Sequence, residues 1–175
     1  AVLRARGVSA PKLDKILVHF SKVNGHLSST MHFRNHPDLD LRGRFFIRQG
    51  YLDNFEFFKW LADFFVLPAL KRVPFEKASS DFLVNAKGAW LKEMDLESAD
   101  VDIKGDFGLG PNDLVSSRLS LTFSRNLLAQ SPKFTPLLRL LCPDTAPLCF
   151  DFQLSGILHK INFRWLQSAF TKRLE

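Results

Sequence analysis

The stretch VDIKGDFGL at residues 101–109 decides the fold class of this chain. Its apolar side chains fall on every second residue with polar residues between them, which is the period of a β-strand with one apolar face. A similar stretch, LDLRGRFFI, occurs sixty-two positions earlier at residues 39–47, and a weaker copy, FQLSGIL, occupies residues 152–158. Three copies predict one strand unit used repeatedly in a sheet. For the third copy, the alternation common to all β proteins is the competing interpretation.

The composition is that of an ordinary globular protein. The 175 residues are 46% hydrophobic and 24% charged, so one folded domain over residues 1–175 is expected and disorder is not. Phenylalanine is unusually frequent, at 18 residues against one tyrosine. This is more aromatic surface than a small core needs, so some of it is expected to line something other than a core.

The net charge of +6 is unevenly distributed. Residues 1–50 carry nine Lys or Arg against three Asp, whereas residues 76–113 carry nine acids against four bases. Nucleic-acid-binding proteins concentrate cations on one face or helix, but here the bases alternate with apolar residues along predicted strands. We therefore expect solvated strand faces and no nucleic-acid partner.

Alternation and turn residues predict most of the remaining elements. Strands are expected at residues 16–20, 27–33, 39–47, 78–87, 90–96, 101–109, 119–123 and 150–154. Asn24-Gly25 is expected to close a hairpin between the first two strands, Pro37 to end the pairing of the second, and residues 110–113 to form a turn. The predicted fold class is α+β and mainly β, a curved antiparallel sheet with an open, taco-like groove.

Helical spacing of apolar residues predicts two or three Phe-rich amphipathic helices. The first covers residues 52–67, with Asp53 or Asn54 as its N-cap, and a second covers 126–141 with an interruption at Ser131-Pro132. A third is expected over the tail at residues 162–175. Its apolar side would contain Phe163, Leu166, Phe170 and Leu174, flanked by Arg164, Lys172 and Arg173. This helix would cap the end of the sheet or, alternatively, touch a bilayer.

The order of these patterns resembles the C-terminal region of AsmA-like proteins, which are relatives of TamB. The resemblance covers residues 25–158 and rests on alternating apolar residues and glycines. The matching positions are Leu39, Leu41, Gly43, Phe45, Ile47, Gly50, Tyr51, Phe82, Val84, Gly88, Leu96, Ser98, Val101, Ile103, Gly105, Phe107, Leu109, Phe152, Leu154 and Gly156.

This resemblance implies a location in the periplasm of a Gram-negative bacterium, in a protein anchored to the inner membrane. AsmA-like proteins are long curved sheets with an apolar groove and are thought to bridge the two membranes and carry phospholipid in outer-membrane biogenesis. The present sequence differs in having no anchor helix, no long repetitive body, and a loop bounded by two cysteines. We therefore expect it to be one end of a longer, membrane-anchored protein.

The candidate lipid groove follows from the alternation. If the repeated strands lie side by side, ten apolar side chains project to one side, because residues two apart share a face. They are Leu41, Phe45, Val101, Ile103, Phe107, Leu119, Leu121, Phe123, Phe152 and Leu154. Their charged neighbours Arg42, Arg44, Asp102, Lys104 and Arg118 would project to water. Whatever the helix at 52–67 leaves uncovered would hold acyl chains; the alternative is a filled core.

The two cysteines, Cys142 and Cys149, bound a short loop that is stiffened by Pro143 and Pro147. Their spacing allows a local disulfide in an oxidising compartment, and two buried thiols are the alternative.

Motifs for catalysis or metal binding are missing from the sequence. It has no nucleophile elbow, phosphate-binding loop or zinc-protease motif. His32 and His36 have helical metal spacing, but His32 lies on a predicted strand next to Pro37. Asp100 and Asp102 share a strand face that continues with Lys104, as expected of a solvated charged edge rather than an acid/base pair.

The expected function is therefore non-enzymatic lipid handling, with phospholipid as the ligand and with neither cofactor nor metal. The first alternative is an interaction module whose strand edge docks on an outer-membrane barrel or assembly factor. An enzyme with an unrecognised site is the second alternative.

Overall fold

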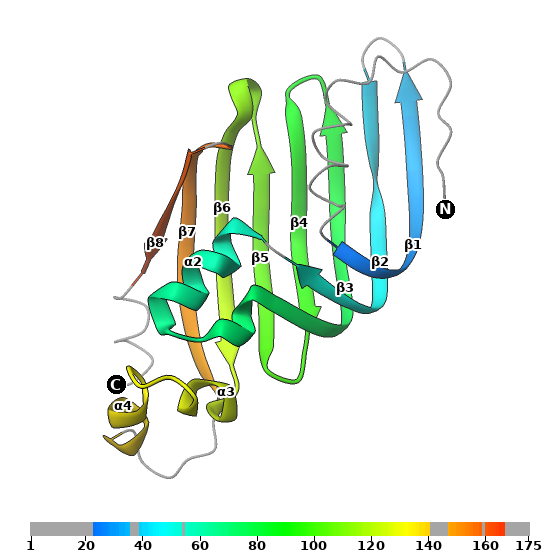
Figure 1. Ribbon diagram of the computed structural model, residues 1–175. Helices are drawn as coiled ribbons and strands as arrows, with labels where there is room; N and C mark the ends of the chain where they lie inside the picture. Colours follow the sequence, from blue (N-terminus) through cyan, green and yellow to red (C-terminus); the bar gives the residue numbers. More distant parts are fainter. Residues whose placement is uncertain (1–22, 36–38, 54, 141–146, 159, 167–175) are drawn as a thin grey trace.

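The computed structural model describes residues 23–35, 39–53, 55–140, 147–158 and 160–166. Within them the chain forms one open sheet of eight strands, each beside its sequence neighbours (Figure 1). The strands are β1 (Val23–Asn35), β2 (Leu39–Asp53), β3 (Arg72–Asn85), β4 (Gly88–Glu97), β5 (Val101–Leu109), β6 (Leu114–Phe123), β7 (Leu148–Ile157) and β8 (Lys160–Trp165). Every neighbouring pair is antiparallel. The prediction of a mainly β, antiparallel fold is confirmed.

The helices lie in three of the connections between strands. They are α2 (Glu56–Phe65), the 3-10 helix η1 (Pro68–Lys71), η2 (Pro111–Asp113), α3 (Arg125–Ala129) and α4 (Thr135–Leu140). The first connection, from β2 to β3, carries α2 across one face of the curved sheet (Figure 1). We call this the inner face and the opposite side the outer face.

Strand alternation places apolar residues of different strands together on the inner face. Val101 of β5 pairs with Phe123 of β6, and Ile103 pairs with Leu121. Cross-strand partners point to the same side of a sheet. The apolar residues at every second position of each strand therefore line up into one apolar layer. The helix α2 supplies the layer above it.

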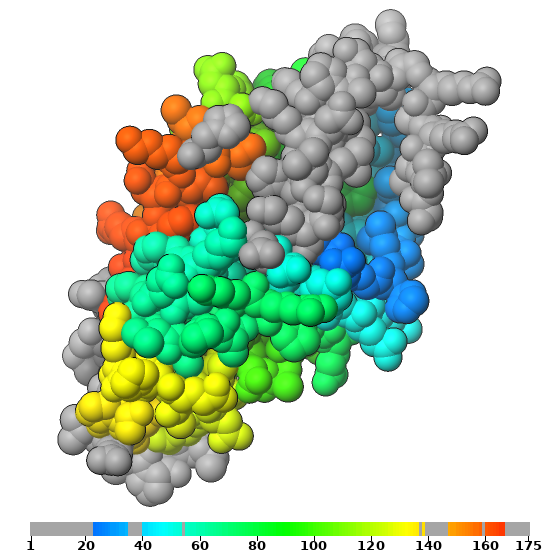
Figure 2. Space-filling model, in the orientation of Figure 1, coloured from blue at the N-terminus to red at the C-terminus, as the bar shows by residue number. Residues whose placement is uncertain are grey.

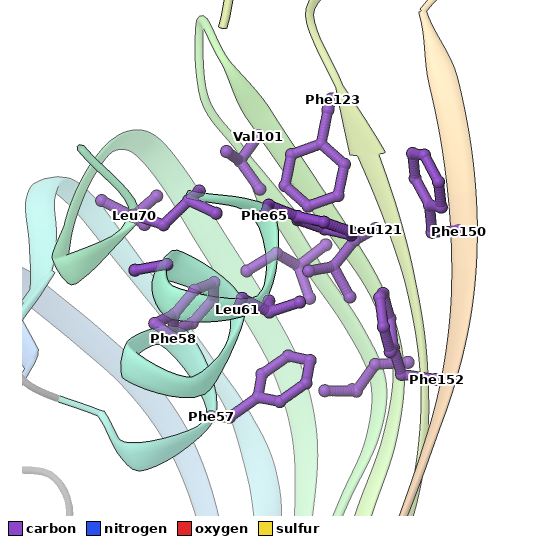
Figure 3. Packing of buried hydrophobic residues seen from close by; sticks show 14 of the residues in the cluster. Phe57, Phe58, Leu61, Phe65, Leu70, Val101, Leu121, Phe123, Phe150 and Phe152 are labelled. Carbon is purple, nitrogen blue, oxygen red and sulfur yellow. The ribbon is translucent and has the colours of Figure 1, made fainter. Parts of the chain in front are cut away.

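The core lies between α2 and the strands β5 to β7. Phe57, Phe58, Leu61, Ala62 and Phe65 of α2 are all buried, and they occupy one side of the helix. Phe65 is the centre of this cluster (Figure 3). Its ring packs at 5.6 Å from Phe123, 4.9 Å from Phe134 and 5.5 Å from Phe150 between centroids. Such edge-on and tilted contacts add to the free energy gained by burial.

A loop after β6 closes the lower end of the core. Ser124 caps α3 by accepting a hydrogen bond from the Leu127 N–H at 3.1 Å, and Leu127 and Leu128 are buried. The Ser131 hydroxyl donates to the Phe65 carbonyl, which joins this loop to the end of α2. Figure 2 shows α2 and α3 as a continuous layer of atoms at this end. Ser131-Pro132 lies between the two short helices, since α3 ends at Ala129 and α4 begins at Thr135.

The predicted hairpin turn at Asn24-Gly25 is wrong. Both residues lie within β1, where Asn24 pairs with Tyr51 of β2 and Gly25 forms a bulge with φ of 144°. A bulge uses the same glycine freedom as a turn, so the dipeptide could not distinguish them. The strand predicted at residues 16–20 lies outside the described residues. Pro37 lies there too, between the ends of β1 and β2.

Two other boundaries differ from the prediction. The strand β3 begins at Arg72 rather than at residue 78, although it contains Pro74. Pairing with β4 extends only to Lys77, so the missing N–H of Pro74 removes no hydrogen bond to β4. The helix α2 begins only at Glu56, because β2 continues to Asp53. Its N-cap is Phe55, which makes no side-chain capping bond.

The helix predicted over the tail is wrong where the structure describes it. Residues 160–165 form β8, in which Phe163 pairs with Leu154 and Trp165 with Phe152. Ile161, Phe163 and Trp165 also alternate, and the free edge of β7 supplies backbone partners that favour a strand. The remaining tail residues, including Phe170 and Leu174, lie outside the described residues.

Candidate functional site

The ten predicted groove residues all lie on the inner face, and the sheet separates them into two groups. Seven are buried, with exposed fractions of 0 to 7%. These are Val101, Ile103, Leu119, Leu121, Phe123, Phe152 and Leu154. The other three, Leu41, Phe45 and Phe107, are half-buried.

The buried group forms the packed core beneath α2. Phe57 of the helix stands edge-on to Phe152 at 5.6 Å, and Phe65 stands edge-on to Phe123 at 5.6 Å (Figure 3). Leu121 and Phe123 have no exposed surface. This part of the inner face is therefore filled by side chains of the same chain.

The inner face of β1 to β3 differs, because exposed apolar side chains remain there. Leu27 is 59% exposed, Met31 36% and Phe33 55%. Through the strand register they adjoin Leu41 and Phe45 of β2 and then Phe82 of β3, which are half-buried. We call Leu27, Met31, Phe33, Leu41, Phe45 and Phe82 the open patch.

The open patch contains no charged side chain. Its other inner positions are Ser29, Gly43 and Ser80, and Ser80 is buried with its hydroxyl donating to the Lys92 carbonyl at 2.8 Å. Gly43 permits close approach of the ring of Phe82, since a Cβ there would lie 3.0 Å from the ring and 2.1 Å from the Thr30 carbonyl oxygen. Phe82 stacks with Phe45 at 6.5 Å. The open patch is therefore made of aromatic and aliphatic side chains.

Comparisons with known proteins do not place the chain in a family. No protein-family model, curated protein or solved structure matches it. The resemblance to AsmA-like proteins stays a prediction, and the function must be argued from the geometry.

The predicted groove did not include four residues of the open patch, namely Leu27, Met31, Phe33 and Phe82. Their alternation was visible in the sequence, but strand period alone does not say which strands lie side by side. Because β1 pairs with β2, its apolar side extends the inner face to the edge of the described sheet.

The outer face carries the charged side chains that alternation assigned to water. Arg42, Arg44, Lys104 and Arg118 are exposed, and Asp102 is half-buried. Ion pairs join neighbouring strands, with Arg44 at 3.5 Å from Asp81.

Two hydrogen-bonded pairs shift pKa values on this face. The hydrogen bond from the Arg42 guanidinium lowers the pKa of Asp40 and raises that of Arg42. A hydrogen bond to Glu97, at 2.5 Å, raises the pKa of Lys77. Each of these three shifts favours the charged form of its group.

The two aspartates considered for acid/base chemistry both accept local hydrogen bonds. Asp100 accepts a hydrogen bond from the Ser124 hydroxyl at 2.7 Å, and Asp102 accepts one from the Ser98 N–H at 3.1 Å. Both bonds hold the loop between β4 and β5. His32 is exposed on β1, while His36 lies outside the described residues. Within the described part of the chain, no group of three or more potential metal ligands occurs.

Only one of the two cysteines lies in the described structure. Cys149 is half-buried on the outer face of β7, with its sulfur 4.0 Å from the Ser120 hydroxyl oxygen. Cys142 lies outside the described residues, so the disulfide stays a prediction. Thiol titration of protein purified without reductant would test it.

Proposed function

We propose that this protein binds the acyl chains of phospholipids on the open patch and acts in lipid handling rather than in catalysis. The observation that supports the proposal is the row of exposed apolar side chains on β1, at an end of the inner face that α2 does not fill. Together with the resemblance to AsmA-like proteins, this favours a role in phospholipid transport between the membranes of a Gram-negative envelope.

The energetics of the open patch favour an apolar occupant. Burying a Leu, Met or Phe side chain completely contributes about 1.5–3 kcal/mol. Leu27 and Phe33 leave more than half of their surface exposed, so covering each would contribute roughly 1 kcal/mol. An acyl chain would gain about 0.8 kcal/mol for each buried methylene and needs no hydrogen-bonding group from the protein. The absence of charge from the open patch suits such a ligand.

The shape of the inner face also suits an extended chain. The patch runs over three adjacent strands, and its innermost part adjoins Ile47 and Val84, which are 6% and 7% exposed. An occupant would therefore lie on a packed apolar floor and remain accessible from the β1 edge. A ligand held in this way can exchange without opening the core.

A crosslinking experiment tests the proposal. A photo-reactive amino acid replaces Phe33 on the inner face or Leu114 on the outer face, each 55% exposed. The protein is irradiated with a short-chain phosphatidylcholine below its micelle concentration, and adducts are measured by mass spectrometry. We expect lipid adducts at position 33 and few at position 114. Equal labelling at both positions, or none at 33, would contradict the proposal.

A second candidate function is docking of another protein on the edge of β1. This strand is 13 residues long, and at the described end of the sheet it has a partner strand on one side only. Such an edge can take up an extended segment of a partner by backbone hydrogen bonding. If crosslinks from position 33, formed in cells, reach a protein and not lipid, this function would replace the first.

A further inference from the structure

The outer face of β1 and β2 carries a cluster of arginines around one exposed aromatic ring. Arg42, Arg44, Phe46 and Arg48 alternate along β2, and Arg34 lies beside them on β1. All four arginines are exposed, and Phe46 is 44% exposed. We call these five residues the basic patch. It lies on the side of the sheet opposite the open patch.

The charges of the basic patch are only partly balanced. Asp40 of β2 pairs with Arg42, and Asp81 of β3 lies 3.5 Å from Arg44. Glu76 of β3 lines the same pocket as Arg48. Four arginines against these three acids leave an excess of one positive charge. The net charge on the outer face of β4 and β5 is negative. The acids there outnumber the bases Lys92 and Lys104, and they are Asp95, Glu97, Asp102 and Asp106. The outer face is therefore more positive on β1 and β2 than on β4 and β5.

The side-chain chemistry of the basic patch fits phosphate groups next to an apolar phase. Every cation in the patch is an arginine, whose planar guanidinium binds phosphate oxygens in pairs better than lysine does. The guanidinium of Arg44 lies 5.4 Å from the ring centroid of Phe46, so charge and aromatic surface are presented together. An aromatic side chain between cations is well placed for the boundary between lipid headgroups and acyl chains.

We propose that the basic patch docks the protein on an anionic phospholipid bilayer. Charge complementarity favours this partner, and the exposed Phe46 would enter the headgroup region while the arginines bind phosphates. Docking through the outer face would leave the open patch on the inner face accessible. The proposal does not depend on lipid binding to the open patch, and either could fail alone.

Vesicle flotation with purified protein tests the docking. Vesicles of phosphatidylcholine alone are compared with vesicles made of equal parts of phosphatidylcholine and phosphatidylglycerol. Both kinds are tested at low and at high salt. We expect binding to the anionic vesicles only, weakened by salt because exposed charges are screened. The Arg48→Gln variant should bind about fivefold more weakly, since one cation near an anionic membrane contributes about 1 kcal/mol. Phe46→Ser should also weaken binding at both salt concentrations.

Two matched controls make the test specific. Arg118→Gln removes the same charge from an exposed outer-face position on β6 and should leave vesicle binding unchanged. Phe33→Ser alters the open patch and should also leave vesicle binding unchanged. Equal weakening by Arg48→Gln and Arg118→Gln would show that net charge alone attracts the protein and would overturn the proposal. Tighter binding to single-stranded RNA than to anionic vesicles, or equal binding to neutral vesicles, would overturn it as well.

Discussion

Replacing Phe65 with alanine is expected to remove much of the stability of this fold. Phe65 is 1% exposed, and its ring packs against Phe123, Phe134 and Phe150 at centroid distances between 4.9 and 5.6 Å. Truncation of a buried phenylalanine typically costs 3–5 kcal/mol, as the lost transfer free energy plus the cavity left behind. We expect about 4 kcal/mol here, because the rings around Phe65 belong to three separate segments and cannot collapse together into the space.

Urea denaturation followed by circular dichroism measures this loss. For a domain of this size 1 kcal/mol corresponds to roughly 2–4 °C in Tm, so the variant should melt about 8–16 °C lower. Phe46→Ala is the matched control, since Phe46 is 44% exposed on the outer face and should cost less than about 1 kcal/mol. Phe33→Ala should be similarly mild, because Phe33 belongs to the open patch. A loss below about 2 kcal/mol for Phe65→Ala would refute the packing of α2 on β6 and β7.

Three further perturbations test local features. Val66 ends α2 with φ of 56° and is 43% exposed, so Val66→Gly should stabilise by about 1 kcal/mol in thermal unfolding, because a β-branched residue is strained there. Gly105→Ala should destabilise by at least about 2 kcal/mol in urea, because φ is +146° and the new Cβ would lie 2.1 Å from the Arg118 carbonyl oxygen. The hydrogen bond from Arg42 lowers the pKa of Asp40, so it stabilises the fold above the ordinary Asp pKa of about 4, and this contribution is lost as pH falls through the lowered value. Unfolding free energies of Asp40→Asn and the parent protein should therefore converge in acid, and a constant difference would contradict the assignment.

The repeated alternation was enough to predict an antiparallel, mainly β fold. The three copies of the pattern lie in β2, β5 and β7, and the glycine of each copy is on the inner face. Local geometry explains this success, since strand period does not depend on what the strand packs against. Boundaries were less predictable. Pro74 argued against a strand at the first residues of β3, which nevertheless begins at Arg72. The strand β2 continues to Asp53, where the helical spacing of apolar residues has already begun.

The tail shows why some elements could not be assigned from sequence. Phe163 and Leu166 fit helical spacing, while Ile161, Phe163 and Trp165 fit strand spacing equally well. The unpaired edge of β7 decided between them, because it offers backbone partners to a strand and none to a helix. That edge exists only once the sheet has formed.

For the candidate site, the sequence by itself determined which residues share a face. Leu41, Ile103 and Leu121 lie on the same side because successive side chains of a strand alternate, whatever surrounds them. Only the tertiary structure decided which of them face a ligand. The ten-residue helix α2 covers the strands near β6 and buries Leu121 completely, while Leu27 and Phe33 at the other edge stay exposed. Burial depends on contacts between segments far apart in the chain, and strand periodicity carries no information about them.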